Sequence, residues 1–312
     1  MTRSLARRAS FWANSFSTGL GYQYARHGSV NARYGNRILK YDKSDGNNYK
    51  SHNASIGTSY QFTAQWNSSL TYSYLDANFE DSDNYTDANF DDSEDFTTHS
   101  AGFNLGYSHS VWNSYSAGVN YSEKNYDTDS IEVPVDDRND YYTVSGNLGW
   151  THAFSPTKTL SMSAGPSYVH RDKDDSRMSG NGNVNYTSAF ENGSWFVGAF
   201  AGLDDRSLGG DADEDLSEYK RAMTGVSWQV AEDLSASLGA SFRDDEFLTS
   251  TGNDEETYNA NARLHYSFGR YFHLSGRYVY TQVVADNSED EYVNHRFLIT
   301  LGASKELKRW IH

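Results

Sequence analysis

The stretch His99–Trp112, HSAGFNLGYSHSVW, alternates between large apolar and small polar side chains. One set is Ala101, Phe103, Leu105, Tyr107, His109 and Val111, and the other is Gly102, Asn104, Gly106, Ser108 and Ser110. Because side chains two residues apart share a face of a β-strand, the stretch predicts a strand with one apolar face and one small polar face.

The same period of two recurs along nearly the whole chain, for example in 222–230, 234–242 and 258–268. The alternating runs are roughly 10–14 residues long, beyond the ~5–6 residues usual in soluble sheets and enough for the ~9–11 tilted residues that cross a bilayer. No stretch of useful length has the 3.6-residue period of a helix, so the sequence predicts an all-β chain.

The connections between these runs are of two kinds, which alternate. Short ones fall at 64–67, 112–114, 155–157, 191–194, 231–233 and 269–272, and long acidic ones lie between them. This asymmetry is typical of an outer-membrane barrel with short periplasmic turns and long extracellular loops.

Composition excludes several classes of protein. The 312 residues are 37% hydrophobic and 15% aromatic, with a mean hydropathy of −0.77. The aromatic content argues against disorder, and no apolar run is long enough for a transmembrane helix. A strand that shows lipid one face and water the other averages out as polar. The net charge of −16 argues against a nucleic-acid partner, and the absence of cysteine excludes disulfides and thiolate metal sites.

The sequence therefore predicts a transmembrane antiparallel up-and-down β-barrel in the bacterial outer membrane. Between Val30 and Ala303 there are about 14 strands. A further alternating segment at 15–26 is a candidate fifteenth strand, which implies sixteen if another strand pairs with it, or else a missing partner. We expect one barrel over 15–312, preceded by an N-terminal tail or incomplete segment at 1–14. Pro166 cannot donate a ladder hydrogen bond, so we expect a bulge there. A soluble β-sandwich or solenoid is the alternative, and it would need a second apolar layer where the chain has small polar residues.

Aromatic side chains gather at strand ends beside the short connections. Amphipathic rings favour the headgroup level of a membrane, so we expect an aromatic girdle at this interface. Its members are Trp66, Trp112, Phe154, Trp195, Phe268, Tyr271 and Phe272.

Three segments resemble the porin-like barrels associated with bacterial exopolysaccharide secretion. They are GYSHSVWNSYSAGVNYSEKNYD (106–127), NLGWTHAFSPTKTLSMSAGPSYVHRD (147–172) and RFLITLGASKEL (296–307). The resemblance covers most of the chain and implies an outer-membrane pore or export accessory, without catalytic residues or a cofactor. The tail KELKRWIH departs from barrels of this kind, which often finish on a strand with a terminal aromatic residue.

Basic residues recur at positions that alternation assigns to the interior. They are Arg33, Arg37, Arg221, Arg243, Arg263, Arg277 and Arg296, with His265 beside them. If the first and last strands adjoin when the barrel closes, these residues form one basic stripe. Arginine lining a pore favours anions and planar carboxylates, so one hypothesis is a stripe that guides an acidic sugar. The alternative is that each arginine pairs with a carboxylate and stiffens the wall.

Other candidate sites are weaker. One loop holds Asp81, Asp83, Asp87, Asp91, Asp92 and Glu94, which could contact a divalent cation or form a solvated surface. His109, His152, His170 and His295 have the apolar-face parity and stand near scattered serines, which does not define a hydrolase site. We therefore expect no enzyme activity and no cofactor.

The function that this reasoning favours is a porin-like channel for passive passage or export of small or polyanionic, sugar-like solutes. The alternative is a structural barrel that sheathes or anchors a partner of a polysaccharide-export or electron-transfer complex. Expected partners are the lipid bilayer and lipopolysaccharide, and beyond them an anionic polysaccharide or a periplasmic export protein.

Overall fold

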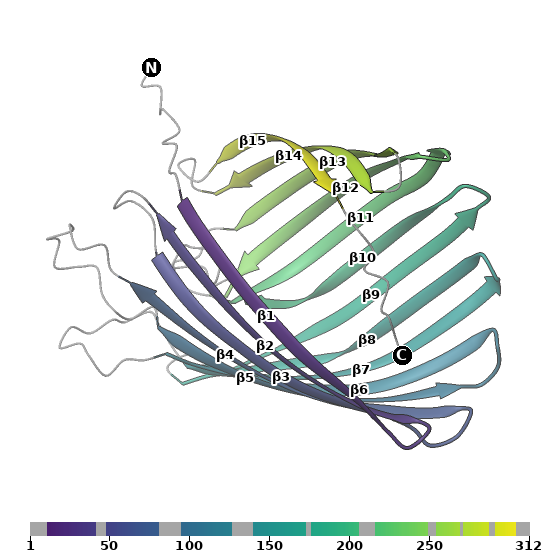
Figure 1. Cartoon of the computed structure of the whole chain (residues 1–312). Coiled ribbons are helices and arrows are strands. Elements are labelled where there is room, and N and C mark those ends of the chain that lie inside the picture. Colours follow the sequence, from purple (N-terminus) through teal and green to yellow (C-terminus); the bar gives the residue numbers. More distant parts are fainter. Residues whose placement is uncertain are drawn as a thin grey trace, which may run out of the picture.

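The computed structural model describes residues 11–41, 48–80, 95–126, 140–172, 176–205, 216–248, 254–268, 271–286 and 291–303. These residues form one antiparallel sheet of fifteen strands, arranged in the order of the chain (Figure 1). The strands are β1 (Phe11–Tyr24), β2 (Gly28–Tyr41), β3 (Asn48–Gln61), β4 (Trp66–Glu80), β5 (Phe96–Ser108), β6 (Asn113–Tyr126), β7 (Tyr141–Ser155), β8 (Lys158–Arg171), β9 (Arg177–Phe190), β10 (Gly193–Asp205), β11 (Leu216–Ala231), β12 (Leu234–Phe247), β13 (Glu255–Phe268), β14 (Phe272–Ala285) and β15 (Tyr292–Ala303).

The all-β, antiparallel, up-and-down prediction is confirmed, because every strand pairs with its neighbours in sequence. The described residues contain no helix of the length and apolarity needed to cross a membrane.

The strand count differs from the expected fourteen. β1 pairs with β2 along its whole length, from Phe11 opposite Tyr41 to Tyr24 opposite Gly28. β1 begins at Phe11, inside the range 1–14 for which the sequence predicts a tail. The fifteenth strand that the 15–26 pattern allowed is therefore present among the described residues.

β1 and β15 are the two edges of the sheet, and they are not paired with each other in the part of the chain that the structure describes (Figure 1). Since successive strands alternate in direction, β1 and β15 run the same way. Antiparallel closure of fifteen strands therefore needs one further strand between them.

The register separates the side chains into two faces. Residues directly opposite each other across strands point to the same side, so Leu148, Ala164, Gly182 and Ala201 form one row across four strands. This side, which also carries Phe103 and Leu264, is here called the apolar face. The other side carries Asn104, Ser163 and Asn183 and is called the polar face.

Most of the buried residues gather at the ends of strands beside the long connections. Tyr49, Ala77, Phe96, Lys124, Tyr126, Tyr141, Val169, Asp245, Phe247 and Val283 are buried there on the polar face. The sheet thus has local clusters in place of a central core, such as Ala77 with Phe96 and Tyr126.

The predicted bulge at Pro166 is wrong. The β7–β8 register is the same on both sides of it, with Ser145 opposite Ser167 and Leu148 opposite Ala164. Proline offers no N–H to the neighbouring strand, and the Asn181 side-chain amide donates to the Gly146 carbonyl at 3.2 Å. A side chain from β9 thus replaces the missing donor without an inserted residue.

Candidate functional site

The register places all seven arginines of the sequence-based stripe on the polar face. Arg33 and Arg37 lie on β2, Arg221 on β11, Arg243 on β12, Arg263 on β13, Arg277 on β14 and Arg296 on β15. Their positions along the sheet divide them into separate groups.

The expected contact of Arg33 and Arg37 with the last strand is not present in the described sheet. β2 is an interior strand, paired with β1 on one side and with β3 on the other. The sequence count started at Val30 and so took β2 for the edge. The arginines of β2 are therefore a group separate from those of β11–β15.

Arg263 and Arg277 are direct cross-strand partners on β13 and β14. Both side chains are exposed, and neither forms an ion pair within the described part of the chain. Arg277 also faces Leu298, and Arg296 lies two residues along β15 on the same face. The polar face thus carries two positive charges directly opposite each other, an arrangement that costs a sheet stability.

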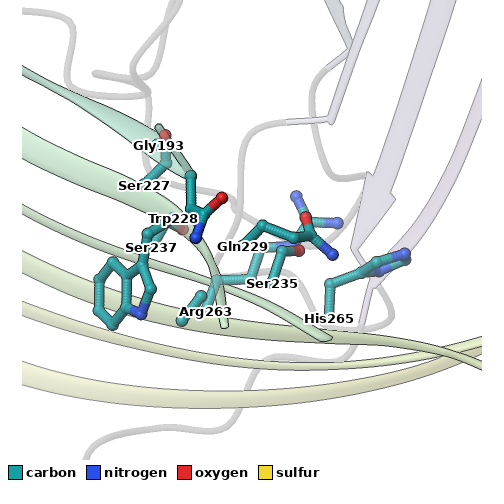
Figure 2. A pocket seen from close by; sticks show the side chains of 10 residues that line it. Gly193, Ser227, Trp228, Gln229, Ser235, Ser237, Arg263 and His265 are labelled. Atoms are coloured by element: carbon teal, nitrogen blue, oxygen red, sulfur yellow. The ribbon is translucent and has the colours of Figure 1, made fainter. Parts of the chain in front are cut away.

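A pocket of about 480 Å³ lies beside Arg263 at the short-connection end of the polar face (Figure 2). Its lining includes Ser227, Gln229, Ser235, Ser237, Arg263 and His265. Figure 2 shows the Trp228 indole pointing away from Gln229 and His265, in keeping with its place on the apolar face. The polar lining is thus made of hydroxyls, an amide, an imidazole and a guanidinium.

His265 adds to this group of donors. Its ring lies 5.4 Å from that of His273 on the next strand. Its Nδ1 atom is enclosed and has no hydrogen-bond partner among the described residues. A guanidinium next to an imidazole and serine hydroxyls can bind a carboxylate or phosphate group.

Arg221 and Arg243 form a second cross-strand arginine pair, on β11 and β12. Here Arg243 donates to both carboxylate oxygens of Asp245 at 2.6 Å and lies 2.7 Å from Asp204. Asp245 is fully buried and also accepts a hydrogen bond from Ser217 at 2.8 Å. For Arg243, the structure shows the carboxylate pairing that was the alternative interpretation of the stripe.

At six places on the described polar face, an asparagine amide lies over a glycine. In each case the two residues are direct cross-strand partners, and a Cβ on the glycine would come close to the amide. The pairs are Gly21–Asn31, Gly102–Asn120, Gly106–Asn67, Gly118–Asn147, Gly198–Asn185 and Gly239–Asn261. The alternation of side chains in the sequence identifies the small polar residues. It does not identify these pairs, because they depend on the register between neighbouring strands.

The predicted girdle residues lie at or beside the short-connection ends of their strands, with exposed rings. Trp66, Trp112, Phe154, Trp195, Phe268, Tyr271 and Phe272 are all exposed. Several contact further aromatic rings, such as Trp66 with Tyr107 at 4.6 Å and Phe268 with Phe272 at 5.7 Å.

The acidic loop candidates Asp81, Asp83, Asp87, Asp91, Asp92 and Glu94 lie outside the described residues. Among the residues that are described, no group of three or more His, Asp or Glu side chains is placed to hold a metal ion. His152, His170 and His295 lie on the apolar face, hydrogen-bonded to Asn113, Ser176 and Tyr278 respectively.

Comparisons with known proteins agree with this architecture. The family model described as "Putative beta-barrel porin 2" matches residues 216–305, which hold both arginine pairs. A search of curated protein sequences gave no match.

Among solved structures, the chain is similar to the barrels of bacterial import receptors. It matches the ferric-catecholate import receptor Fiu from E. coli K12 (9% identity, TM-score 0.53, 90% of this chain and 59% of that chain). It also matches the ferric preacinetobactin receptor BauA from Acinetobacter baumannii (12%, TM-score 0.56, 90% and 55%) and the ferric citrate transporter FecA (10%, TM-score 0.53, 94% and 55%). The chain thus spans little more than half the length of these receptors, and the likeness is one of fold.

The fold and these matches indicate an outer-membrane β-barrel that is porin-like over residues 216–305. In such a barrel the apolar face meets lipid and the polar face surrounds the interior. The exopolysaccharide part of the resemblance rests on the sequence alone.

Proposed function

We propose that the chain forms an outer-membrane channel for small anionic or acidic sugar-like solutes, with Arg263, Arg277 and Arg296 as its anion-selecting group. The observation that carries this proposal is the direct opposition of Arg263 and Arg277 on the polar face, exposed and without an ion pair among the described residues. A wall that keeps two like charges side by side attracts the opposite charge from solution.

The surroundings of this group suit an acidic sugar. Serine hydroxyls and Gln229 line the adjacent pocket, and asparagine amides cover the neighbouring wall. These groups hydrogen-bond hydroxyls, while the guanidinium groups hold a carboxylate. Export of an acidic exopolysaccharide is the finer form of this proposal, supported by the sequence resemblance.

The experiment is a bilayer measurement of ion selectivity. Replacing Arg263, Arg277 and Arg296 together by Ser should move the reversal potential in a KCl gradient toward cation selectivity. The matched control replaces Lys50, Lys158 and Lys220 by Ser, which removes the same charge from exposed positions on the apolar face. Unchanged selectivity in the arginine variant, or an equal shift in the lysine variant, would remove the proposal.

The same recording separates the channel from the structural alternative. A barrel that sheathes or anchors a partner, or is filled by its own side chains, conducts little when it is reconstituted alone. Open single-channel steps support the channel, and a silent bilayer with inserted, folded protein supports the sheath.

A further inference from the structure

A repeated pair of side chains stands on the apolar face, near the long-connection ends of the strands. The Tyr34 hydroxyl lies 2.7 Å from Nδ1 of His52, that of Tyr72 lies 2.8 Å from Nδ1 of His99, and that of Tyr278 lies 2.9 Å from Nδ1 of His295. In each case the tyrosine and histidine lie on adjacent strands and are diagonal neighbours. The arrangement thus occurs three times with the same atoms.

The geometry determines what each histidine offers to its surroundings. A tyrosine hydroxyl that donates to Nδ1 fixes the neutral imidazole with its proton on Nε2. Within the described residues, Nε2 of His99 and His295 has no hydrogen-bond partner. At His52 the donor nitrogen of the Asn36 amide lies 3.3 Å from Nδ1 and 3.5 Å from Nε2. With the proton on Nε2, His99 and His295 present a free N–H donor on the lipid-facing side of the barrel, and His52 presents one beside the Asn36 amide.

The height of these pairs corresponds to a membrane interface. On β4, the apolar face runs from Trp66 at the short-connection end to Asp76. At ~3.3 Å per residue and a tilt of about 40°, that interval spans ~25 Å, the height of the apolar band of an outer-membrane barrel. His52 is opposite Asp76 and stands at its upper limit, and His99 is opposite Tyr74 and stands about 5 Å below that limit. Both lie on the side of the long connections, which in such barrels is the outer leaflet.

The patch on β2–β5 is the richest in donors. Lys50 lies two residues from His52 on the same face, and the Tyr74 ring lies 5.0 Å from that of His99. Asp76, opposite His52, is the carboxylate of the patch, and its Oδ1 accepts a hydrogen bond from Asn78 at 2.7 Å. Imidazole and ammonium donors suit phosphate oxygens, and exposed tyrosine rings suit the faces of sugars.

Other tyrosines of the apolar face have a different partner. Tyr121 donates to Glu123 at 2.9 Å, and Tyr258 donates to Glu256 at 2.7 Å. These positions on β6 and β13 present carboxylates, which repel a phosphate. The β2–β5 patch differs from these positions because its carboxylate, Asp76, accepts a hydrogen bond from Asn78 and lies diagonal to Lys50, whose charge opposes its own.

We propose that the Tyr–His pairs bind the phosphorylated sugar headgroup of an outer-leaflet glycolipid, and that the β2–β5 patch is the main site. The lipid is recognised by Nε2–H donors and Lys50 at its phosphates and by tyrosine rings at its sugars. This proposal requires the barrel to lie in the outer membrane and does not depend on what the channel carries.

The test is lipid binding by native mass spectrometry in detergent, with bis-phosphorylated lipid A, dephosphorylated lipid A and phosphatidylcholine as probes. The variant His52→Leu/His99→Leu/His295→Leu should lose at least about tenfold in affinity for lipid A, since the loss of even one hydrogen bond to a charged group weakens binding by about that factor. Its binding of dephosphorylated lipid A and phosphatidylcholine should change little.

The matched control Glu123→Gln/Glu256→Gln changes acceptor patches of the same face and should bind lipid A as well as the wild type or better. If the triple variant does not fold, as judged by heat-modifiable gel mobility, His99→Gln and His99→Leu are compared. Glutamine keeps an N–H donor, so only His99→Leu should weaken binding. Equal affinity of the histidine variants and wild type for lipid A, or equal wild-type affinity for lipid A and phosphatidylcholine, would overturn the proposal.

Discussion

The two cross-strand arginine pairs differ in what balances their charge. Arg243 of the Arg221–Arg243 pair is held by Asp245 and Asp204, and one of these carboxylates is fully buried. The Arg263–Arg277 pair faces a polar pocket and has no carboxylate partner among the described residues. The same residue type at the same parity is thus held in ion pairs in one place and exposed in the other.

The comparison shows that strand parity alone does not identify a functional charge. Both pairs break the rule that like charges avoid direct opposition. Among the described residues, carboxylates compensate the charge at Arg243 but not at Arg263 or Arg277. An arginine contributes to the field inside a pore to the extent that it is not already neutralised.

The largest expected effect is on stability at the compensated pair. Asp245→Asn removes a buried carboxylate and leaves Arg243 partly unpaired, so the free energy of unfolding should fall by about 3 kcal/mol. Asp244→Asn is the control, because the Asp244 side chain is 40% exposed and lies 3.8 Å from the exposed Lys220. Its loss should be at most about 0.5 kcal/mol. Urea unfolding in lipid vesicles measures both, and equal losses would contradict the assignment.

A charge reversal should have opposite effects at the two pairs. Arg277→Glu creates an attractive pair with Arg263 and should raise the free energy of unfolding by about 0.5 kcal/mol while lowering anion selectivity. Arg221→Glu adds a carboxylate beside Arg243, Asp204 and Asp245 and should bring no gain. Urea unfolding in lipid vesicles measures both variants. If Arg221→Glu stabilised the protein as much as Arg277→Glu, the proposed difference between the two arginine pairs would be contradicted.

Salt should affect the two pairs unequally, and this is the smallest effect. Raising KCl from about 0.1 M to 1 M shortens the screening length from ~10 Å to ~3 Å. The selectivity difference between wild type and the Arg263/Arg277/Arg296 variant should shrink, as seen in reversal potentials. The stability difference between wild type and Asp245→Asn should persist, because that carboxylate is buried. A selectivity difference that is unaffected by salt would point to a steric cause.

The features that could be predicted from the sequence are those that depend on the two-residue alternation of side chains within a single strand. Alternation alone gives the face of Arg263, Leu264 and Phe103, and it predicts the all-β class and the two kinds of connection. These properties follow from a backbone that turns successive side chains to opposite sides. No knowledge of neighbouring strands is needed for them.

What depends on lateral register could not be predicted. The binding of Arg243 by Asp204 joins β10 to β12, and the Asn181 amide replaces the N–H that Pro166 lacks. The glycine–asparagine pairs and the Tyr–His pairs also need the register of two strands. The place of Arg33 was misjudged because one uncounted strand, β1, moves it from the edge to the interior.

The most direct test of the account is the reactivity of a single engineered thiol, since the chain has no native cysteine. Ser237 faces Arg263 on the polar face, and Leu264 lies on the apolar face. In lipid vesicles, Ser237→Cys should react with water-soluble thiosulfonates, and faster with the anionic than with the cationic reagent relative to a free thiol. Leu264→Cys should react with neither. A thiol at 237 that is inert or prefers the cationic reagent, together with a reactive thiol at 264, would contradict a water-filled interior with a positive wall.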